Sequence, residues 1–165
     1  MKVNLVAFGK LKTPGLREAA DYYKRLIRPW VPIKEIEFKS LPVPDKVAET
    51  RRQIQEKEGE MLLERIQHEI SGRGILVLLD ERGKSQTTQA WADQVRSWEG
   101  ESIPSVTFCI GSSLGFSGAV RDRAKLSLSL GLQTLPHELA RVVLLEQLYR
   151  TWSVIRGHPY HNEGG

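Results

Sequence analysis

The sequence contains one cysteine, Cys109, in 165 residues, which excludes an internal disulfide. It has no apolar run close to the roughly 20 residues that cross a bilayer. The amino-terminal stretch MKVNLVAFGKLK has neither the apolar core nor the small-residue cleavage site of a signal peptide. Cys109 has no neighbours at the spacing of metal ligands. We therefore expect a cytoplasmic protein that is not bound to a membrane and holds no metal.

The composition predicts one compact domain over residues 1–165. The chain is 40% hydrophobic and 27% charged, which at this length is enough for one buried core and too little for two. A net charge of +4 is compatible with a polyanionic partner, although the signal is weak. The basic residues are spread along the chain, so any RNA-binding surface must be assembled by folding.

The hydrophobic pattern predicts an α/β fold, a mostly parallel sheet flanked by helices. Apolar runs rich in branched residues alternate with stretches that have helical periodicity. The run ILVLLD is apolar without alternation, as expected for a central strand that is covered on both faces. The predicted strands are Val3–Phe8, Ile33–Phe38, Gly74–Asp80, Ser105–Ile110 and Leu126–Leu132.

Turns after three of these strands are candidate ligand sites, because open parallel sheets bind ligands at the carboxyl ends of their strands. The turns follow Asp80, Ile110 and Leu130. The second places Gly111 and Gly115 where the backbone turns sharply or approaches a ligand. It lacks the lysine of a phosphate-binding P-loop and the full dinucleotide glycine fingerprint, so ATP and NAD are disfavoured.

The last predicted helix, from about Pro136 to Ile155, is apolar on more than one face. A surface helix of a small monomer does not need so many apolar residues. We therefore expect it to pack on the sheet and also to bury a partner, with a twofold homodimer as the default. Arg141 and Arg150 can extend along the apolar surface with their charged ends in water, pair with Glu138 and Glu146, or face RNA phosphate, and we favour pairing for at least one.

Several motifs in order along the whole chain carry a family resemblance: VNLVAFGK, LLDERGK, IGSSLG, TLPHELAR, LLEQLYR and GHPYH. With these motifs the sequence resembles the bacterial ribosomal RNA large-subunit pseudouridine methyltransferases, a branch of the SPOUT superfamily. The resemblance implies an S-adenosylmethionine-dependent enzyme that methylates N3 of a pseudouridine in 23S ribosomal RNA. It also implies a C-terminal trefoil knot, a homodimer and the assembled ribosome as substrate.

The same resemblance places S-adenosylmethionine at the end of the LLD strand and in the next two loops. The first of these two loops, Gly111–Gly115, departs from the family's usual Gly-Gly-Pro-x-Gly pattern, because Ser112 and Ser113 replace glycine and proline. This puts the preorganisation of the loop in doubt. The implied cofactor residues are Leu79, Gly111, Leu130, Gly131, Leu132, Gln133, Thr134 and Leu135.

Catalysis by such an enzyme requires removal of the N3 proton, because a neutral imide nitrogen is a poor nucleophile. The carboxyl-terminal segment supplies the candidates. We expect Tyr160 to pack near the target base, and His161 or His158 to assist proton removal or to hold RNA phosphate, across the dimer interface. The alternative function is a non-catalytic RNA- or ribosome-binding module of the same fold that lost its cofactor through the Ser112-Ser113 change.

Overall fold

The computed structural model describes residues 1–162, with side chains for residues 1–160. Its centre is a five-stranded sheet in the order β2-β1-β4-β3-β5, and all its strand pairs are parallel. The predicted α/β class with a parallel sheet is therefore confirmed. The strands are β1 (Lys2–Phe8), β2 (Ile33–Phe38), β3 (Ile75–Ser85), β4 (Ser105–Ile110) and β5 (Leu126–Ser129).

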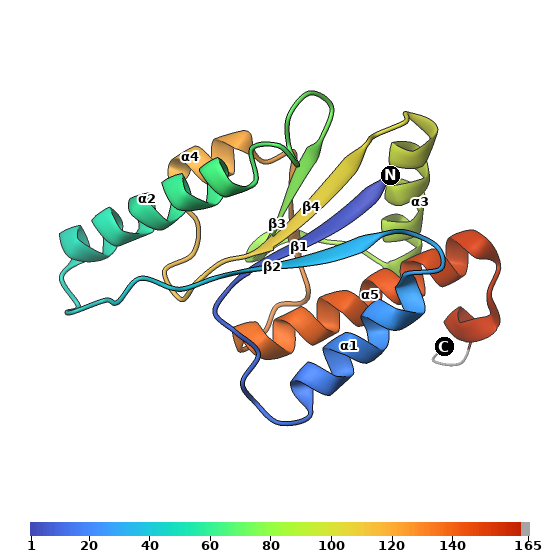
Figure 1. The fold of residues 1–165 in the computed structure, drawn as a ribbon, viewed down its shortest axis with the longest axis horizontal. Coiled ribbons are helices and arrows are strands. Elements are labelled where there is room, and N and C mark those ends of the chain that lie inside the picture. The colour runs from blue at the N-terminus through green and yellow to red at the C-terminus, as the bar shows by residue number, and fades with distance from the viewer. Residues whose placement is uncertain (163–165) are drawn as a thin grey trace.

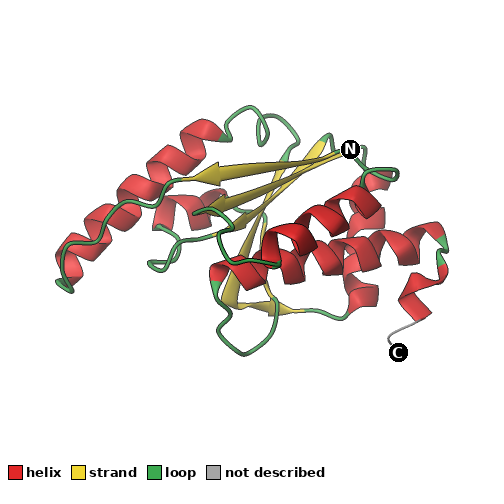
Figure 2. Cartoon of the chain, turned by 60° about the horizontal axis from the view of Figure 1, so that its bottom comes forward, coloured by secondary structure: helices red, strands yellow, loops and turns green. Residues whose placement is uncertain are grey.

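Helices cover both faces of the sheet, as Figure 1 shows by label and Figure 2 shows in a second view. Residues of α1, α3 and α5 pack into the larger core on one face, and residues of α2 and α4 into a smaller core on the other. A short 3-10 helix, η1 (Pro159–Asn162), follows the last α-helix. The α-helices are α1 (Leu16–Ile27), α2 (Ala48–Arg65), α3 (Thr88–Gly100), α4 (Gly118–Arg123) and α5 (His137–Arg156).

The burial of each strand follows its place in the sheet. All six residues of β4 are buried, because both faces of this inner strand are covered. The edge strand β2 has one buried residue, Ile36, and alternates it with charged side chains that include Glu35 and Glu37. Charged side chains on an edge strand discourage pairing with other chains, and here the two carboxylates also receive buried cations.

Two strand ends differ from the sequence prediction. The strand predicted to end at Asp80 continues to Ser85, and its register against Leu128 shifts between Leu79 and Lys84. The strand predicted to reach residue 132 ends at Ser129. There the Ser129 hydroxyl contacts both the N–H and the carbonyl of Gly131, at 3.1 and 2.5 Å, so the chain turns instead of continuing the ladder.

Within residues 1–162, no helix combines the length and the apolar character that a bilayer crossing needs. The same residues contain no group of three or more histidine, cysteine or acidic side chains placed to hold a metal ion. The trefoil knot and the single domain over residues 1–165 stay predictions.

Candidate functional site

A pocket of about 610 Å³ opens at the carboxyl edge of the sheet. The carboxyl half of β3 and the loops after β4 and β5 line it together with the start of α5. The sequence singled out these three places, although the first proves to be part of β3, and parallel strands bring them together because their carboxyl ends share one edge. The volume is in the range of pockets that enclose a cofactor-sized molecule.

The structure brings all but one of the predicted cofactor residues into this pocket. Leu132 is the exception, because its side chain is 93% exposed and does not line the cavity. Gly131, with φ of +150°, precedes it, in a conformation that residues with a side chain rarely adopt. The predicted residues that line the pocket are Leu79, Gly111, Leu130, Gly131, Gln133, Thr134 and Leu135.

Sequence reasoning missed the buried wall behind Gly111. A Cβ added to this glycine would lie 3.2 Å from the Phe116 ring, so a side chain here would displace Phe116, which also lines the pocket. Phe116 is 6% exposed, and the Arg121 guanidinium lies 5.9 Å from its ring centroid. Phe116 and Arg121 both line the pocket, the latter from α4. The signal in the sequence that indicates α4 is Ser117, an N-cap residue. Its hydroxyl accepts a hydrogen bond from the Val120 N–H at the start of this short helix.

The rim of the pocket is charged. Asp80 accepts hydrogen bonds from Arg121 at 2.6 Å and from the Arg82 backbone N–H at 2.9 Å. Burial alone would raise the pKa of Asp80, but these two donors hold it below its usual value, so the carboxylate stays ionised. Across the rim, Thr134 donates to Glu81 at 2.6 Å and ties the loop after β5 to β3.

The amino end of α5 forms the remaining wall and is fixed by polar contacts. The His137 ring lies over Gly9, where an added Cβ would be 3.0 Å from it. Arg141 is fully buried and donates to Glu35, to Glu37 and to the Gly9 carbonyl at 3.1, 2.6 and 2.8 Å.

The suggested partner for Arg141 was therefore wrong. Glu138 instead accepts from the backbone N–H groups of Lys12 and Thr13. The suggested partner for Arg150 is confirmed, because Arg150 donates to Glu146 at 2.7 Å. Glu146 lies one helical turn before Arg150, as expected for a local pair on a helix.

The predicted catalytic tail lies at the opposite end of α5 (Figure 1). Tyr160 packs 4.4 Å from the Tyr149 ring and donates its hydroxyl to Glu146 at 3.2 Å. The His158 ring contacts Trp30 edge-on at 5.6 Å. Burial, followed by hydrogen bonding with Tyr23, raises the pKa of the Tyr160 hydroxyl above its usual range, so it is neutral at physiological pH. The side chain of His161 lies outside the described residues.

The tail and the pocket are separated within one chain. Helix α5 has 20 residues, which span about 30 Å at 1.5 Å per residue. The pocket includes His137 and Ala140 at its first turn, whereas η1 follows its last turn. Within one chain, the tail therefore lies about the length of α5 away from the pocket.

The fold and the pocket define an α/β protein with a cofactor-sized pocket at the carboxyl edge of a parallel sheet. A family model described as "Predicted SPOUT methyltransferase" matches residues 1–161. The chain therefore belongs to the SPOUT methyltransferase family.

Curated relatives match over nearly the full length. Proteins of Streptococcus pneumoniae strains CGSP14 and 70585, both named "Ribosomal RNA large subunit methyltransferase H", are 38% identical over 163 residues, 98% of this chain and 99% of theirs. Among solved structures, the SpoU methyltransferase AviRb from Streptomyces viridochromogenes, in complex with the cofactor AdoMet, aligns with a TM-score of 0.48. That alignment has 12% identity and covers 93% of this chain and 61% of that chain.

Proposed function

We propose that this protein is an S-adenosylmethionine-dependent methyltransferase that methylates N3 of a pseudouridine in 23S ribosomal RNA. The observation that carries the proposal is the 38% identity, over 98% of this chain, to relatives named as large-subunit ribosomal RNA methyltransferases. The pocket supports it, because it is lined by the segments in which the family resemblance places the cofactor. The proposed enzyme acts in the cytoplasm and uses no metal.

The pocket suits the cofactor chemically. Adenine is recognised well by backbone N–H and C=O groups between apolar walls, and the loops around Gly111 and Leu130–Leu135 supply both. Leu79 and Leu130 provide apolar walls, and Gly111 leaves the space that a side chain would take. When bound, S-adenosylmethionine supplies an electrophilic methyl group on a sulfonium.

The residues of this chain must then align the acceptor nitrogen and exclude water. Positive charge disappears during methyl transfer, so positioning in a dry site is the main contribution of the protein. The N3 proton also has to leave, and His158, Tyr160 and His161 are the proposed residues. Tyr160 is neutral, so we assign it to packing on the base and assign proton removal or phosphate contact to the histidines.

A homodimer brings the two parts of the site together. If two α5 helices pack antiparallel about a twofold axis, the tail of each chain lies at the pocket end of the other. The exposed side of α5 offers an apolar stripe for this contact, with Leu139 37% exposed and Val142 and Val143 half-buried. The proposed active site therefore combines the pocket of one chain with the tail of its partner.

Cofactor binding separates this proposal from a non-catalytic ribosome-binding module. Calorimetry with S-adenosylmethionine is expected to show binding by the wild type and loss of binding by Gly111→Val, because the new side chain meets Phe116. Gly100→Val is the matched control, since a Cβ at Gly100 has no neighbour within 4 Å. A wild type that binds no cofactor up to millimolar concentration would instead establish the module.

Mixed dimers test the shared site. Gly111→Val removes the pocket of a chain, and a Tyr160→Ala/His161→Ala variant removes its tail. A random mixture of the two inactive variants should recover about a quarter of wild-type methylation, because half of the dimers are mixed and each has one intact site. If each chain used its own tail, the mixture would stay inactive.

In this proposal the substrate is the assembled ribosome, because the chain carries only a modest net charge of +4 for contact with RNA phosphate, so the shape of the ribosomal surface must help to select the nucleotide. Mass spectrometry of 23S ribosomal RNA from cells that lack the protein should reveal one missing methyl group on a pseudouridine. In vitro, purified ribosomes should be methylated much faster than protein-free RNA. Efficient methylation of a short hairpin would contradict this part.

A further inference from the structure

We propose that Glu58 and Gln55 of α2 are positioning residues that hold the loop Gly111–Gly115 in the shape that binds the cofactor. This inference rests on the proposed function, because the loop is a wall of the proposed cofactor pocket. The loop has no proline to fix its backbone, since serines occupy positions 112 and 113. Side chains from a neighbouring helix supply the constraint instead.

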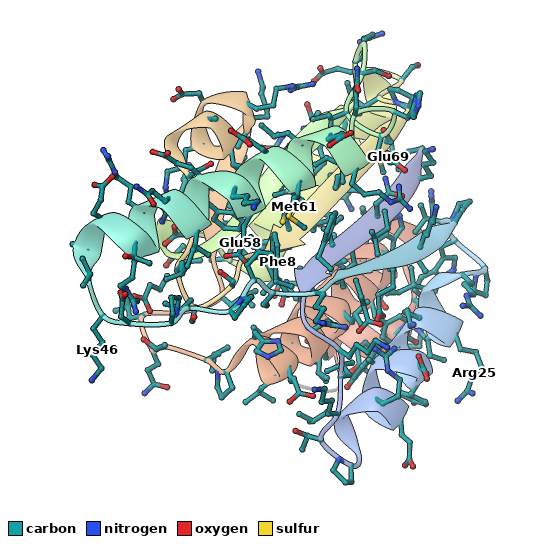
Figure 3. The ribbon with its side chains drawn as sticks, turned by 60° about the vertical axis from the view of Figure 1, so that its left-hand side comes forward. Phe8, Arg25, Lys46, Glu58, Met61 and Glu69 are labelled. Atoms are coloured by element: carbon teal, nitrogen blue, oxygen red, sulfur yellow. The ribbon has the colours of Figure 1, made fainter. Side chains whose placement is uncertain are left out.

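Glu58 is the unusual feature of α2. This helix is mostly charged and exposed, yet Glu58 is only 3% exposed. Figure 3 shows it on the side of α2 that faces the strands, whereas Lys46 points away from the molecule. A buried carboxylate is costly unless it accepts hydrogen bonds. Glu58 accepts from the Ser112 hydroxyl at 2.7 Å and from the Leu41 backbone N–H at 3.4 Å.

The contact with Ser112 continues into the loop backbone. The Ser112 hydroxyl, while donating to Glu58, accepts from the Leu114 N–H at 3.2 Å. Donation to a carboxylate makes the serine oxygen a better acceptor, so the two bonds strengthen each other. The Leu114 carbonyl is fixed as well, because Gln55 donates to it at 2.6 Å. Helix α2 therefore fixes both backbone polar groups of Leu114, the carbonyl directly through Gln55 and the N–H through Ser112.

The turn that these bonds close is otherwise weakly determined. The Gly115 N–H donates to the Ser112 carbonyl at 3.0 Å, and Gly115 has φ of +73°. Glycine adopts this conformation readily but also adopts many others, so a free loop would sample several shapes. The bonds from Glu58 and Gln55 select one of them before any ligand arrives.

A close contact between α2 and the start of α4 fixes the position of α2 relative to this loop. A Cβ added to Gly59 would lie 2.2 Å from the Ser117 hydroxyl oxygen and 3.1 Å from a Val120 methyl. The bare backbone of α2 therefore rests directly on the start of α4. Gly59 follows Glu58 in the sequence, so this contact holds the Glu58 carboxylate at hydrogen-bond distance from Ser112.

The test compares Glu58→Leu, Glu58→Gln and Ser112→Ala. We expect Glu58→Leu and Ser112→Ala each to raise the Kd and the KM for S-adenosylmethionine about tenfold, the size of one lost charge-assisted hydrogen bond, with kcat within about twofold. Glu58→Gln should recover most of the affinity, because its amide oxygen still accepts from Ser112. The double variant Glu58→Leu/Ser112→Ala should be no worse than either single one. Glu60→Gln, on the exposed side of α2, is the matched control and should not change the Kd.

A second measurement needs no cofactor. Hydrogen exchange of the Leu114 and Gly115 amides in the free protein should accelerate about tenfold in Glu58→Leu and in Ser112→Ala, because both open the same turn. Unchanged exchange in Ser112→Ala, additive effects of the two substitutions on Kd, or a fall in kcat at constant KM would overturn the inference. A wild type that binds no cofactor would refute the proposed function, while the exchange data would still decide whether α2 holds the loop.

Discussion

The two ends of α5 are anchored by different chemistry. At the amino end, the fully buried Arg141 binds Glu35, Glu37 and the Gly9 carbonyl. At the carboxyl end, the buried contacts are between aromatic rings, with Trp30 stacked on Tyr149 at 5.3 Å and an interplanar angle of 10°. The ion pairs at this end, Arg150 with Glu146 and Arg156 with Glu99, are partly exposed to solvent. Charged contacts fix positions and angles closely, whereas ring stacking tolerates small displacements.

This difference agrees with the proposed functions of the two ends, cofactor binding at the amino end and contact with the partner chain and RNA at the carboxyl end. The amino end is a wall of the pocket, where loop backbone must keep its place within tenths of an ångström to receive a cofactor. The carboxyl end presents a tail that, in the proposed dimer, engages both a partner chain and RNA. Stacked rings with a polar edge suit contacts that form and break during turnover.

Arg141→Ala should have the largest effect. It removes a fully buried cation from Glu35 and Glu37. Because Lys24 and Arg17 still pair with Glu35 and Arg17 still lies near Glu37, we expect a loss of about 3 kcal/mol, the lower end of the cost of breaking a buried ion pair. Urea unfolding should show this decrease, and cofactor affinity should fall with it because the pocket wall loses its anchor.

Arg17→Ala provides the control for this prediction. Arg17 also donates to Glu35, at 2.6 Å, but its side chain is 34% exposed. A partly solvated ion pair contributes at most about 1 kcal/mol. Equal losses of stability in Arg17→Ala and Arg141→Ala would show that burial of the cation does not anchor α5.

Trp30→Leu should have an intermediate effect at the other end of the helix. It removes the stack on Tyr149 and the edge contact with His158, and an aromatic pair of this kind contributes about 1 kcal/mol beyond its buried area. The Kd for S-adenosylmethionine should stay at the wild-type value while kcat on ribosomes falls, because the tail loses its support. A raised Kd with unchanged kcat would contradict the separation of the two ends.

The location of the pocket could be predicted from the sequence, but some of its contacts could not. The strands and their order along the chain are readable from apolar runs, although the ends of β3 and β5 were not, and parallel strands bring the segments around Asp80, Gly111 and Leu130 to one edge. The partners of Arg141 were not readable, because Glu35 and Glu37 are 106 and 104 residues away whereas Glu138 is adjacent on the helix. Local spacing predicts local pairs alone.

Two further features lay beyond sequence reasoning for a related reason. Glu58 looks like its neighbours in a charged helix, and only the close seating of Gly59 on α4 buries it. The family resemblance placed Leu132 in the pocket as part of the loop Leu130–Leu135, but after the turn at Gly131 its side chain is exposed. Tertiary contacts decide both cases.

The smallest expected effect concerns the first turn of α5 and depends on pH. Hydrogen bonds from the Thr13 and Lys12 backbone N–H groups, and from the Thr13 hydroxyl, lower the pKa of Glu138 from 4.5 to about 2. The folded protein thus binds this proton less readily than the unfolded chain does. The stabilising contribution is complete above about pH 4.5 and is lost as the pH falls toward 2.

The difference in unfolding free energy between wild type and Glu138→Gln should therefore be constant from neutral pH to about 5 and then shrink as the carboxylate is protonated. The Thr13 amide resonance should titrate with the same midpoint. A Glu138 carboxyl that titrates near 4.5 would show that the loop before α1 is not held by α5 in solution. In that case the contacts of Arg141 with Glu35, Glu37 and the Gly9 carbonyl would be the main polar contacts that hold the amino end of α5. The difference between the two ends of the helix would then depend on Arg141.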